Sequence, residues 1–190
     1  MKETITPAGL LVRPSTPQDL TAITAIYGWH VRHGSGTFEL EAPEAAEVAR
    51  RRDDVLAKGL PWLVAERRDD GRVVGYAYAN HFRPRLAYRF ALEDSVYVDD
   101  TARGRGVGRL LLAELVARCE AAGARQMFAL IGDSDNAASV ALHRALGFED
   151  VGTMRAAGWK FDRWLDVVIL QRPLGLGHAT GPQETAPTRP

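Results

Sequence analysis

Apolar residues recur along the chain at two periods, which predicts an alternation of helices and strands. Leu20, Ile23 and Ile26 have the spacing of one helical face, and Thr16-Pro17 before them are residue types that begin helices. Shorter apolar runs bounded by turn residues predict strands. We expect strands over residues 10–13, 62–66, 73–80, 90–98, 126–131, 148–153 and 164–171, and helices over 17–33, 44–58, 110–121 and 134–146.

The order of these elements predicts the fold class. Strands separated by helices alternate with consecutive strands typical of hairpins, so we expect an α/β (α+β) fold with a mixed central sheet of about seven strands, flanked by helices on both faces. Residues 1–9 are polar, and from residue 173 onward Gly, Pro and Thr dominate without periodicity. We therefore expect a flexible N-terminus (1–9), one folded domain (10–172) and a disordered C-terminal tail (173–190).

The composition narrows the possible functions. Lys plus Arg and Asp plus Glu number 24 each, so the chain has no overall charge that would attract nucleic acid or an anionic membrane. The single cysteine, Cys119, excludes an intrachain disulfide, and its helical spacing among leucines favours a buried, inert thiol. The histidines lack metal-ligand spacing, and no apolar run has the length of a membrane span or a signal peptide. We expect a cytoplasmic protein with no metal, nucleic-acid or membrane partner.

The sharpest local pattern is Arg103-Gly104-Arg105-Gly106-Val107-Gly108, between a predicted strand and a predicted helix. Glycines let a backbone approach a ligand closely, and the N–H groups at a helix start bind anions, so this segment is a candidate pyrophosphate loop. No Gly-Lys-Ser/Thr closes it as in a P-loop, and Arg109 stands where a dinucleotide fingerprint has its third glycine. Taken alone, the pattern fits an ordinary helix start with solvated arginines equally well.

Two motifs together resemble the GNAT family of N-acetyltransferases. Arg103-x-x-Gly106-x-Gly108 is similar to the acetyl-CoA pyrophosphate loop of that family. The second motif follows the offsets of its coenzyme-binding helix and consists of Asn136, Ser139, His143, Gly147 and Phe148. The resemblance implies the GNAT fold and acetyl-CoA as co-substrate. The coenzyme-binding residues that it implies are Ser95, Val96, Tyr97, Val98, Arg103, Gly104, Arg105, Gly106, Val107, Gly108, Asn136 and Ser139.

Three stretches narrow the resemblance to phosphinothricin and methionine sulfoximine N-acetyltransferases. They are residues 82–89, 93–98 and 160–166, and the whole resemblance covers about residues 11–172. It implies a small amino-acid-like substrate and a homodimer. Departures at Gly28-Trp29-His30, Trp159 and Asp162 leave the precise substrate open. The substrate-binding residues that the resemblance implies are Phe82, Arg83, Pro84, Leu92, Glu93 and Asp94.

The chemistry of amide formation suggests catalytic roles for two residues. An amino acid's amine is mostly protonated at neutral pH, so its attack on a thioester requires a base. Glu93 is the candidate base because apolar neighbours in its strand can raise its pKa, although an ordinary edge-strand glutamate has the same pattern. His143 stands where many GNAT enzymes place the Tyr that protonates the leaving thiolate. Its imidazole could act as acid or base, or serve a purely structural role.

Arg83 is the candidate clamp for a substrate carboxylate, because a guanidinium pairs with a carboxylate through two parallel hydrogen bonds. Arg85 and Arg89 are further candidates, and a solvated basic loop is the alternative. Acetylation of peptide N-termini, diamines or aminoglycosides is a second hypothesis, although such substrates favour an acidic groove. A non-catalytic acyl-CoA-binding module is the third.

Overall fold

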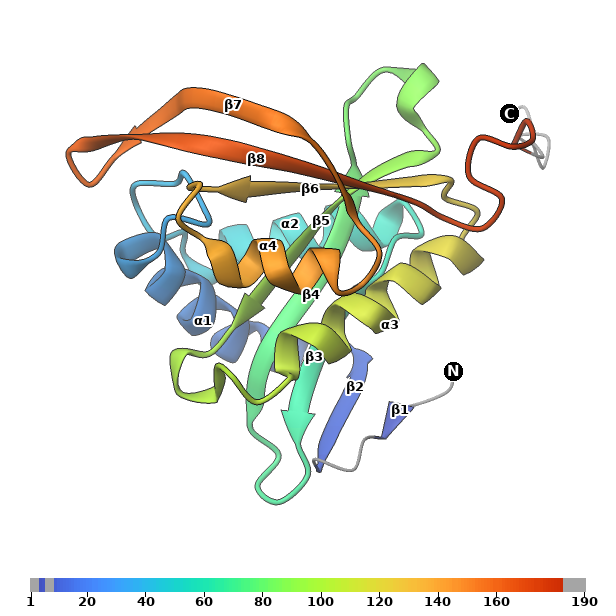
Figure 1. Cartoon of the computed structure of the whole chain (residues 1–190). Helices are drawn as coiled ribbons and strands as arrows, with labels where there is room; N and C mark the ends of the chain where they lie inside the picture. The colour runs from blue at the N-terminus through green and yellow to red at the C-terminus, as the bar shows by residue number, and fades with distance from the viewer. Residues whose placement is uncertain (1–3, 6–8, 183–190) are drawn as a thin grey trace.

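One mixed sheet forms the centre of the molecule (Figure 1), in a computed structural model that describes residues 4–5 and 9–182. Its strand order is β1-β2-β3-β4-β5-β6-β8-β7, and only the neighbours β5 and β6 run parallel. This is the predicted mixed sheet of about seven strands with the two-residue β1 added. The strands are β1 (Thr4–Ile5), β2 (Leu10–Pro14), β3 (Trp62–Arg67), β4 (Val73–His81), β5 (Ala91–Val98), β6 (Gln126–Gly132), β7 (Glu149–Lys160) and β8 (Arg163–Pro173).

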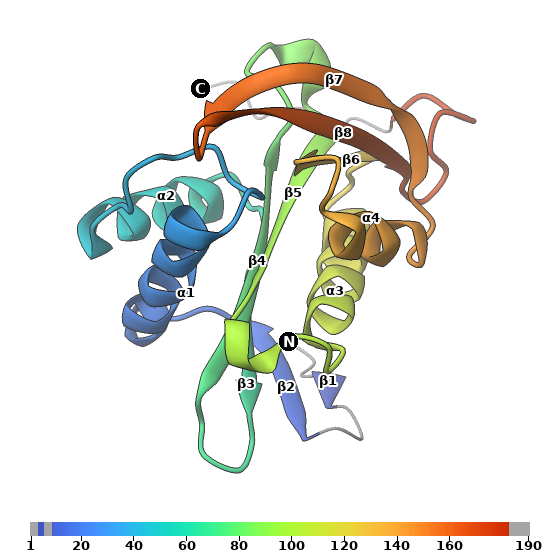
Figure 2. The same cartoon turned by 60° about the vertical axis from the view of Figure 1, so that its left-hand side comes forward.

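Helices cover both faces of the sheet, as predicted (Figure 2). α1 (Leu20–His33) and α2 (Ala45–Ala57) lie on one face, and α3 (Val107–Ala121) and α4 (Ala137–Arg144) lie on the other. α3 begins three residues before the predicted Leu110. The reason is Gly106, whose φ of +81° turns the chain directly into the helix.

The core between α3 and the sheet explains why the strongest helical pattern in the sequence is found here. Leu111, Leu112, Leu115 and Cys119 are all fully buried on one face of α3. Burial raises the pKa of the Cys119 thiol to about 12, so the thiol stays protonated at neutral pH. The prediction that Cys119 is buried is confirmed.

The sheet is split at its only parallel pair. β5 pairs with β4 along its whole length, from His81↔Leu92 to Gly75↔Val98. Its pairing with β6 stops after Glu93↔Phe128, and the two strands then separate. The backbone of residues 94–98 is therefore unpaired on the β6 side, and a gap opens between β5 and the start of α4.

The last two strands form a hairpin longer than the predicted strands 148–153 and 164–171. β7 and β8 pair as far as Lys160↔Arg163, with two register irregularities in β7, and the hairpin reaches toward the connection between α1 and α2 (Figure 1). The chain after β8 does not continue as the expected loose tail over its described part. Leu174 is fully buried, and its N–H donates to the Arg125 carbonyl at 3.0 Å.

The remaining parts of the two predicted flexible ends, residues 1–3, 6–8 and 183–190, lie outside the described residues. Within the described part, residues 4–5 pair with residues 11–12 of β2. Both predicted flexible ends therefore contribute a short ordered segment: the tail through one buried side chain, and the N-terminus through one strand pairing. Neither segment is long enough to show a hydrophobic period in the sequence.

Candidate active site

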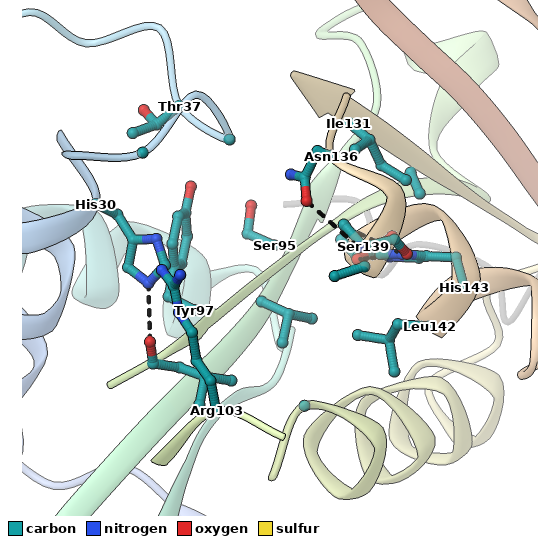
Figure 3. Close-up of a pocket in the computed structure, with 18 of the residues that line it drawn as sticks. His30, Thr37, Ser95, Tyr97, Arg103, Ile131, Asn136, Ser139, Leu142 and His143 are labelled. Atoms are coloured by element: carbon teal, nitrogen blue, oxygen red, sulfur yellow. Dashed lines mark hydrogen bonds and ion pairs between the residues drawn. The ribbon is translucent and has the colours of Figure 1, made fainter. Parts of the chain in front are cut away.

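A cavity of about 860 Å³ occupies the gap between β5 and β6 (Figure 3). One wall is the second half of β5, and the opposite wall is the end of β6 with the start of α4. The glycine-rich loop 103–108 closes one end, and the connection after α1 closes the other. The predicted residues that line the cavity are Glu93, Asp94, Ser95, Val96, Tyr97, Val98, Arg103, Gly104, Gly106, Val107, Gly108, Asn136, Ser139 and His143.

The loop before α3 has the geometry of an anion site. Gly104 and Gly106 have φ values of +72° and +81°, a backbone conformation that residues other than glycine rarely adopt. An added Cβ at either position would meet no atom within 4 Å. Glycine at these positions therefore serves the backbone path rather than tight packing. Gly108 differs, because its Cβ would lie 3.3 Å from the end of the Leu142 side chain, which would have to shift by a few tenths of an ångström. The N–H groups of the first turn of α3 have no helical acceptors and face this end of the cavity.

The two arginines of this loop diverge. Arg103 lines the cavity, as the sequence analysis expected. Arg105 does not, because its side chain lies on the other side of the loop, in a second hollow that it lines with Arg67, Arg68 and Arg72. The position of the Arg105 side chain therefore gives no support to its expected role in pyrophosphate binding, which stays a prediction.

The start of α4 lies across the cavity from β5. The Asn136 side chain caps the helix by accepting from the Ser139 N–H at 3.4 Å. Its amide nitrogen faces the connection after α1, because a Cβ added to Gly36 would lie 3.6 Å from it. Asn136 thus lies beside Ile131 on the α4 side of the cavity, with its side chain directed into the cavity (Figure 3).

Strand alternation separates the residues of β5 into two sets. Glu93, Ser95 and Tyr97 face α1, whereas Leu92 and Asp94 face α3 and α4. Leu92 is only 1% exposed and belongs to the core, so its side chain does not line the cavity, and its expected substrate contact stays a prediction. The family resemblance implied the contact, whereas the alternation of the strand turns the Leu92 side chain to the face opposite Glu93.

Glu93 presents a carboxylate to the cavity. It is half-buried, and within the described part of the chain it has no hydrogen-bond partner. Burial raises the pKa of Glu93, the charge of Arg83 opposes that rise, and the charge of Asp94 adds to it. Tyr78 and Ser95 are paired across β4 and β5, lie on the same face of the sheet and also line the cavity. Glu93 is therefore an accessible carboxylate with raised basicity, as the sequence predicted it could be.

His143 lies on the other face of β5 and is 4% exposed. Its Nε2 lies 3.0 Å from Asp94 Oδ2 and its Nδ1 lies 2.7 Å from the Ser139 carbonyl oxygen. Burial alone would lower the pKa of His143, but the hydrogen bond and charge of Asp94 outweigh it and the pKa is raised. Because both ring nitrogens face acceptors, His143 has neither a free lone pair nor a free N–H for the cavity.

The basic loop 82–89 lies beside the cavity rather than in its wall. The Phe82 ring stacks on Phe128, with centroids 4.3 Å apart, and the Arg83 guanidinium lies 4.2 Å from the Phe82 ring centroid. Pro84 is exposed. Phe82, Arg83 and Pro84 do not line the cavity, although the Arg83 charge acts on Glu93. Their substrate role is thus untested by this arrangement.

Sequence reasoning missed the wall that follows α1. His30, Tyr78 and the segment 34–37 line the cavity. Lys160 at the end of β7 holds this segment, because its ammonium donates to the carbonyls of Gly34 at 3.0 Å and Thr37 at 2.8 Å. The only local signal was the Gly34-Ser35-Gly36 turn, and its partner lies 123 or more residues away in the chain.

Two findings bear on other functions. No three His, Cys, Asp or Glu side chains of the described residues gather in a way that could hold a metal ion. None of the helices in the described ranges has both the length and the apolar character needed to cross a membrane.

Comparison with known proteins gives one consistent answer. The acetyltransferase (GNAT) family matches residues 23–148. The chain is 54% identical over 172 residues to a phosphinothricin N-acetyltransferase of Alcaligenes faecalis, covering 90% of this chain and 86% of that protein. It is 40% identical over 160 residues to an L-methionine sulfoximine/L-methionine sulfone acetyltransferase of Pseudomonas aeruginosa, covering 84% and 92%.

A solved structure agrees in fold. A GNAT superfamily phosphinothricin acetyltransferase from Sinorhizobium meliloti, crystallised in complex with AcCoA, matches with a TM-score of 0.90 and 48% identity, covering 93% of this chain and 95% of that one. The predicted fold class is therefore confirmed. With its split sheet, its glycine loop at the start of α3 and these relatives, the chain belongs to the GNAT family and is an acetyltransferase.

Proposed function

We propose that this acetyltransferase transfers the acetyl group of acetyl-CoA to the amino group of a small amino-acid-like substrate of the phosphinothricin or methionine sulfoximine type. One observation carries the proposal: a single cavity joins an anion-binding loop at one end to an unpartnered, half-buried Glu93 at the other. The named activities of the relatives from Alcaligenes faecalis and Pseudomonas aeruginosa support the substrate class.

The cavity fits an extended coenzyme. Phosphates suit the N-terminus of α3, where the loop 104–108 offers N–H groups beside Arg103. The pantetheine arm then runs between the unpaired backbone of β5 and Asn136, where amide groups on both sides offer hydrogen bonds. This path brings the thioester to the level of Ser95, next to Glu93.

Glu93 removes a proton from the substrate ammonium, directly or through one water. The neutral amine then attacks the thioester carbonyl, and an N–H of the unpaired β5 backbone stabilises the oxyanion that develops. The raised pKa of Glu93 brings its basicity nearer to neutral pH than that of an ordinary glutamate. The nitrogen of the tetrahedral intermediate then loses its extra proton to solvent, and collapse breaks the C–S bond, so that the neutral amide forms and the expelled coenzyme thiolate takes up a proton from solvent.

His143 assists from below the cavity wall rather than as a freely exposed acid. Its hydrogen bonds to Asp94 and to the Ser139 carbonyl favour the protonated imidazole of the His143–Asp94 pair, in the last turn of α4. The positive pole of this pair lies next to the path of the leaving thiolate. Proton release from His143 requires that one of these two hydrogen bonds breaks first.

Arg83 binds the carboxylate of the substrate once the substrate is in place. Its guanidinium is exposed, donates only to the Phe82 carbonyl at 2.9 Å within the described residues, and acts on Glu93 by its charge. An α-amino acid carries its carboxylate next to the amine. A cation beside the base therefore suits such a substrate better than a diamine or an aminoglycoside.

The proposal is tested by thiol release from acetyl-CoA with a panel of acceptors: phosphinothricin, methionine sulfoximine, methionine sulfone, a diamine, an aminoglycoside and a peptide with a free N-terminus. Rapid release with the first three alone supports the proposed substrate class. Release only with the peptide, diamine or aminoglycoside contradicts it, and binding of acetyl-CoA without release with any acceptor indicates a binding module.

The proposal includes a homodimer. The β7–β8 hairpin exposes Met154, Trp159, Phe161 and Trp164, with 61% of Trp164 exposed, and β7 is an unpaired sheet edge. A second copy of this chain would bury these large apolar side chains. Light scattering at micromolar concentration should give twice the mass of the chain, and a monomer would contradict this part of the proposal.

A further inference from the structure

Arg103 leaves the coenzyme loop and reaches across to α1. Its guanidinium carbon lies 4.5 Å from the centroid of the Trp29 ring, and the end of its side chain approaches His30 (Figure 3). On its other side it lies 3.4 Å from the Asp100 carboxylate. The arginine is therefore held between an aromatic ring and a single exposed acid, although its own side chain is about half exposed.

Helix α1 is itself tied to the end of β5 at this point. His30 Nε2 lies 2.9 Å from the Val98 carbonyl oxygen, and because a carbonyl only accepts, the imidazole donates. The His30 ring packs edge-on against Trp29, with centroids 5.3 Å apart, and against Tyr97. Trp29 thus has a fixed position relative to the strand that leads into the coenzyme loop.

We propose that Trp29 is a positioning residue that holds the Arg103 guanidinium at the mouth of the cavity, ready to bind the coenzyme pyrophosphate. The inference rests on acetyl-CoA being the acyl donor. Arg105 of the same loop offers a contrast, since it does not line the cavity and lines the second hollow instead. Of the two loop arginines, the one that faces the cavity is the one that stacks on α1.

The benefit of the platform is preorganisation. An arginine side chain loses rotamer freedom when it binds a phosphate, and a ring that already restricts the guanidinium reduces that loss. A phosphate competes with Asp100 for the guanidinium but not with Trp29, because the ring contacts the guanidinium face and leaves the N–H edges available. The stacked arginine can therefore bind a phosphate without leaving the ring.

The test compares acetyl-CoA binding to the full chain and to Trp29→Leu by calorimetry. We expect about two- to fivefold weaker binding, the usual effect of losing a cation–π contact at an exposed site. Trp29→Phe, which keeps a ring, should recover most of the affinity. Phe90→Leu is the matched control, because Arg89 also lies 4.5 Å from the Phe90 ring centroid but outside the cavity, and its acetyl-CoA affinity should equal that of the wild type.

Two further arms locate the effect. In an Arg103→Ala background, Trp29→Leu should produce no additional loss of acetyl-CoA affinity, and the KM for S-acetylpantetheine, which lacks the phosphates, should be the same with and without Trp29. The loss should persist with 3′-dephospho-acetyl-CoA, which retains the pyrophosphate.

An equal loss in both backgrounds would overturn the inference, since Trp29 would then act without Arg103. A loss that vanishes with the dephospho coenzyme would overturn the assignment to the pyrophosphate. If the wild-type protein fails to bind acetyl-CoA, the proposed function itself is wrong, whereas normal binding by wild type and Trp29→Leu alike contradicts the inference alone.

Discussion

The two ends of the cavity are built in different ways. The end to which we assign the coenzyme phosphates is formed largely by one continuous segment, 98–108, whose backbone includes two glycines at positive φ. The acceptor end is assembled from side chains of four separate elements: Glu93 on β5, Tyr78 on β4, the segment 34–37 after α1, and Lys160 of β7 behind that segment.

This difference indicates which features of the sequence specify binding by backbone groups and which specify binding by side chains. A backbone site depends on local conformation, so a short motif specifies it and many side chains around it can vary. A side-chain site depends on how distant elements pack, so small changes in packing alter it. Substrate preference within the family should therefore vary at the acceptor end, whereas coenzyme binding depends on the loop.

Replacement of Glu93 is the largest expected effect and the strongest test of the contrast. Glu93→Gln keeps shape and hydrogen bonding but loses basicity, so turnover should fall about 10²–10⁴-fold while acetyl-CoA affinity hardly changes. Because the pKa of Glu93 is raised, the wild-type rate should decline as pH falls through a value above that of an ordinary glutamate, and the variant should lack this limb. Near-full turnover of the variant over about pH 6–9 would remove Glu93 as the base.

The buried pair between Asp94 and His143 should affect stability as much as chemistry. Asp94→Asn leaves a buried imidazole without its charged partner and should lower the free energy of unfolding by about 3–5 kcal/mol in denaturant titrations. Asp150→Asn is the control, because Asp150 pairs with Arg144 at 2.8 Å in an exposed position and should contribute under about 1 kcal/mol.

The same pair predicts a pH dependence. The folded pKa of His143 lies above its unfolded value, so the stability it contributes is fully present below the ordinary histidine pKa of about 6.5 and is lost as pH rises through the folded value. The difference in unfolding free energy between wild type and Asp94→Asn should therefore shrink as pH rises above this range. A difference that grows with pH would contradict the charged pair.

Arg83 sharpens the comparison at the acceptor end. Arg83→Ala should raise the KM for an amino-acid substrate about ten- to a hundredfold, the range expected for a hydrogen bond to a charged group. The amide or ester of the same substrate should be hardly affected, because it lacks the carboxylate. Measured steady-state constants with both compounds decide this, and equal losses would exclude a carboxylate clamp.

The smallest expected effect comes from replacing single glycines, one in the proposed coenzyme loop and one in a turn far from the cavity. Gly106→Ala and Gly71→Ala both place a side chain at a positive φ, +81° and +70°, with open space around the new Cβ. Each should reduce stability by about 1–2 kcal/mol. Only Gly106→Ala should weaken acetyl-CoA binding, since Gly71 lies in the turn between β3 and β4. Equal affinities in both variants would mean that the loop 104–108 does not bind the coenzyme.

Much of the fold was predictable because its signals are local. The buried residues Leu111, Leu112 and Leu115 of α3 recur at the helical period. The glycines at 104 and 106 indicate a turn whose backbone conformation glycine adopts most easily. The sequence was less informative where a single residue or a contact with a distant segment determines whether a side chain is buried. Leu174 is buried although its neighbours show no periodicity, and Leu92 faces the core although Glu93 beside it faces the cavity.

By itself, the sequence determined the order of the elements and the mixed sheet, because each depends on a period within a few residues. Its motifs also identified the glycine-rich loop and Glu93 as candidates, but the family resemblance was needed to favour their functional roles over ordinary structural ones. The tertiary structure alone decided that His143 is enclosed between Asp94 and Ser139, that Lys160 holds the segment 34–37, and that Arg103 rather than Arg105 faces the cavity. These arrangements depend on how strands diverge and helices pack, and such contacts join residues too far apart in the chain for any local pattern to record.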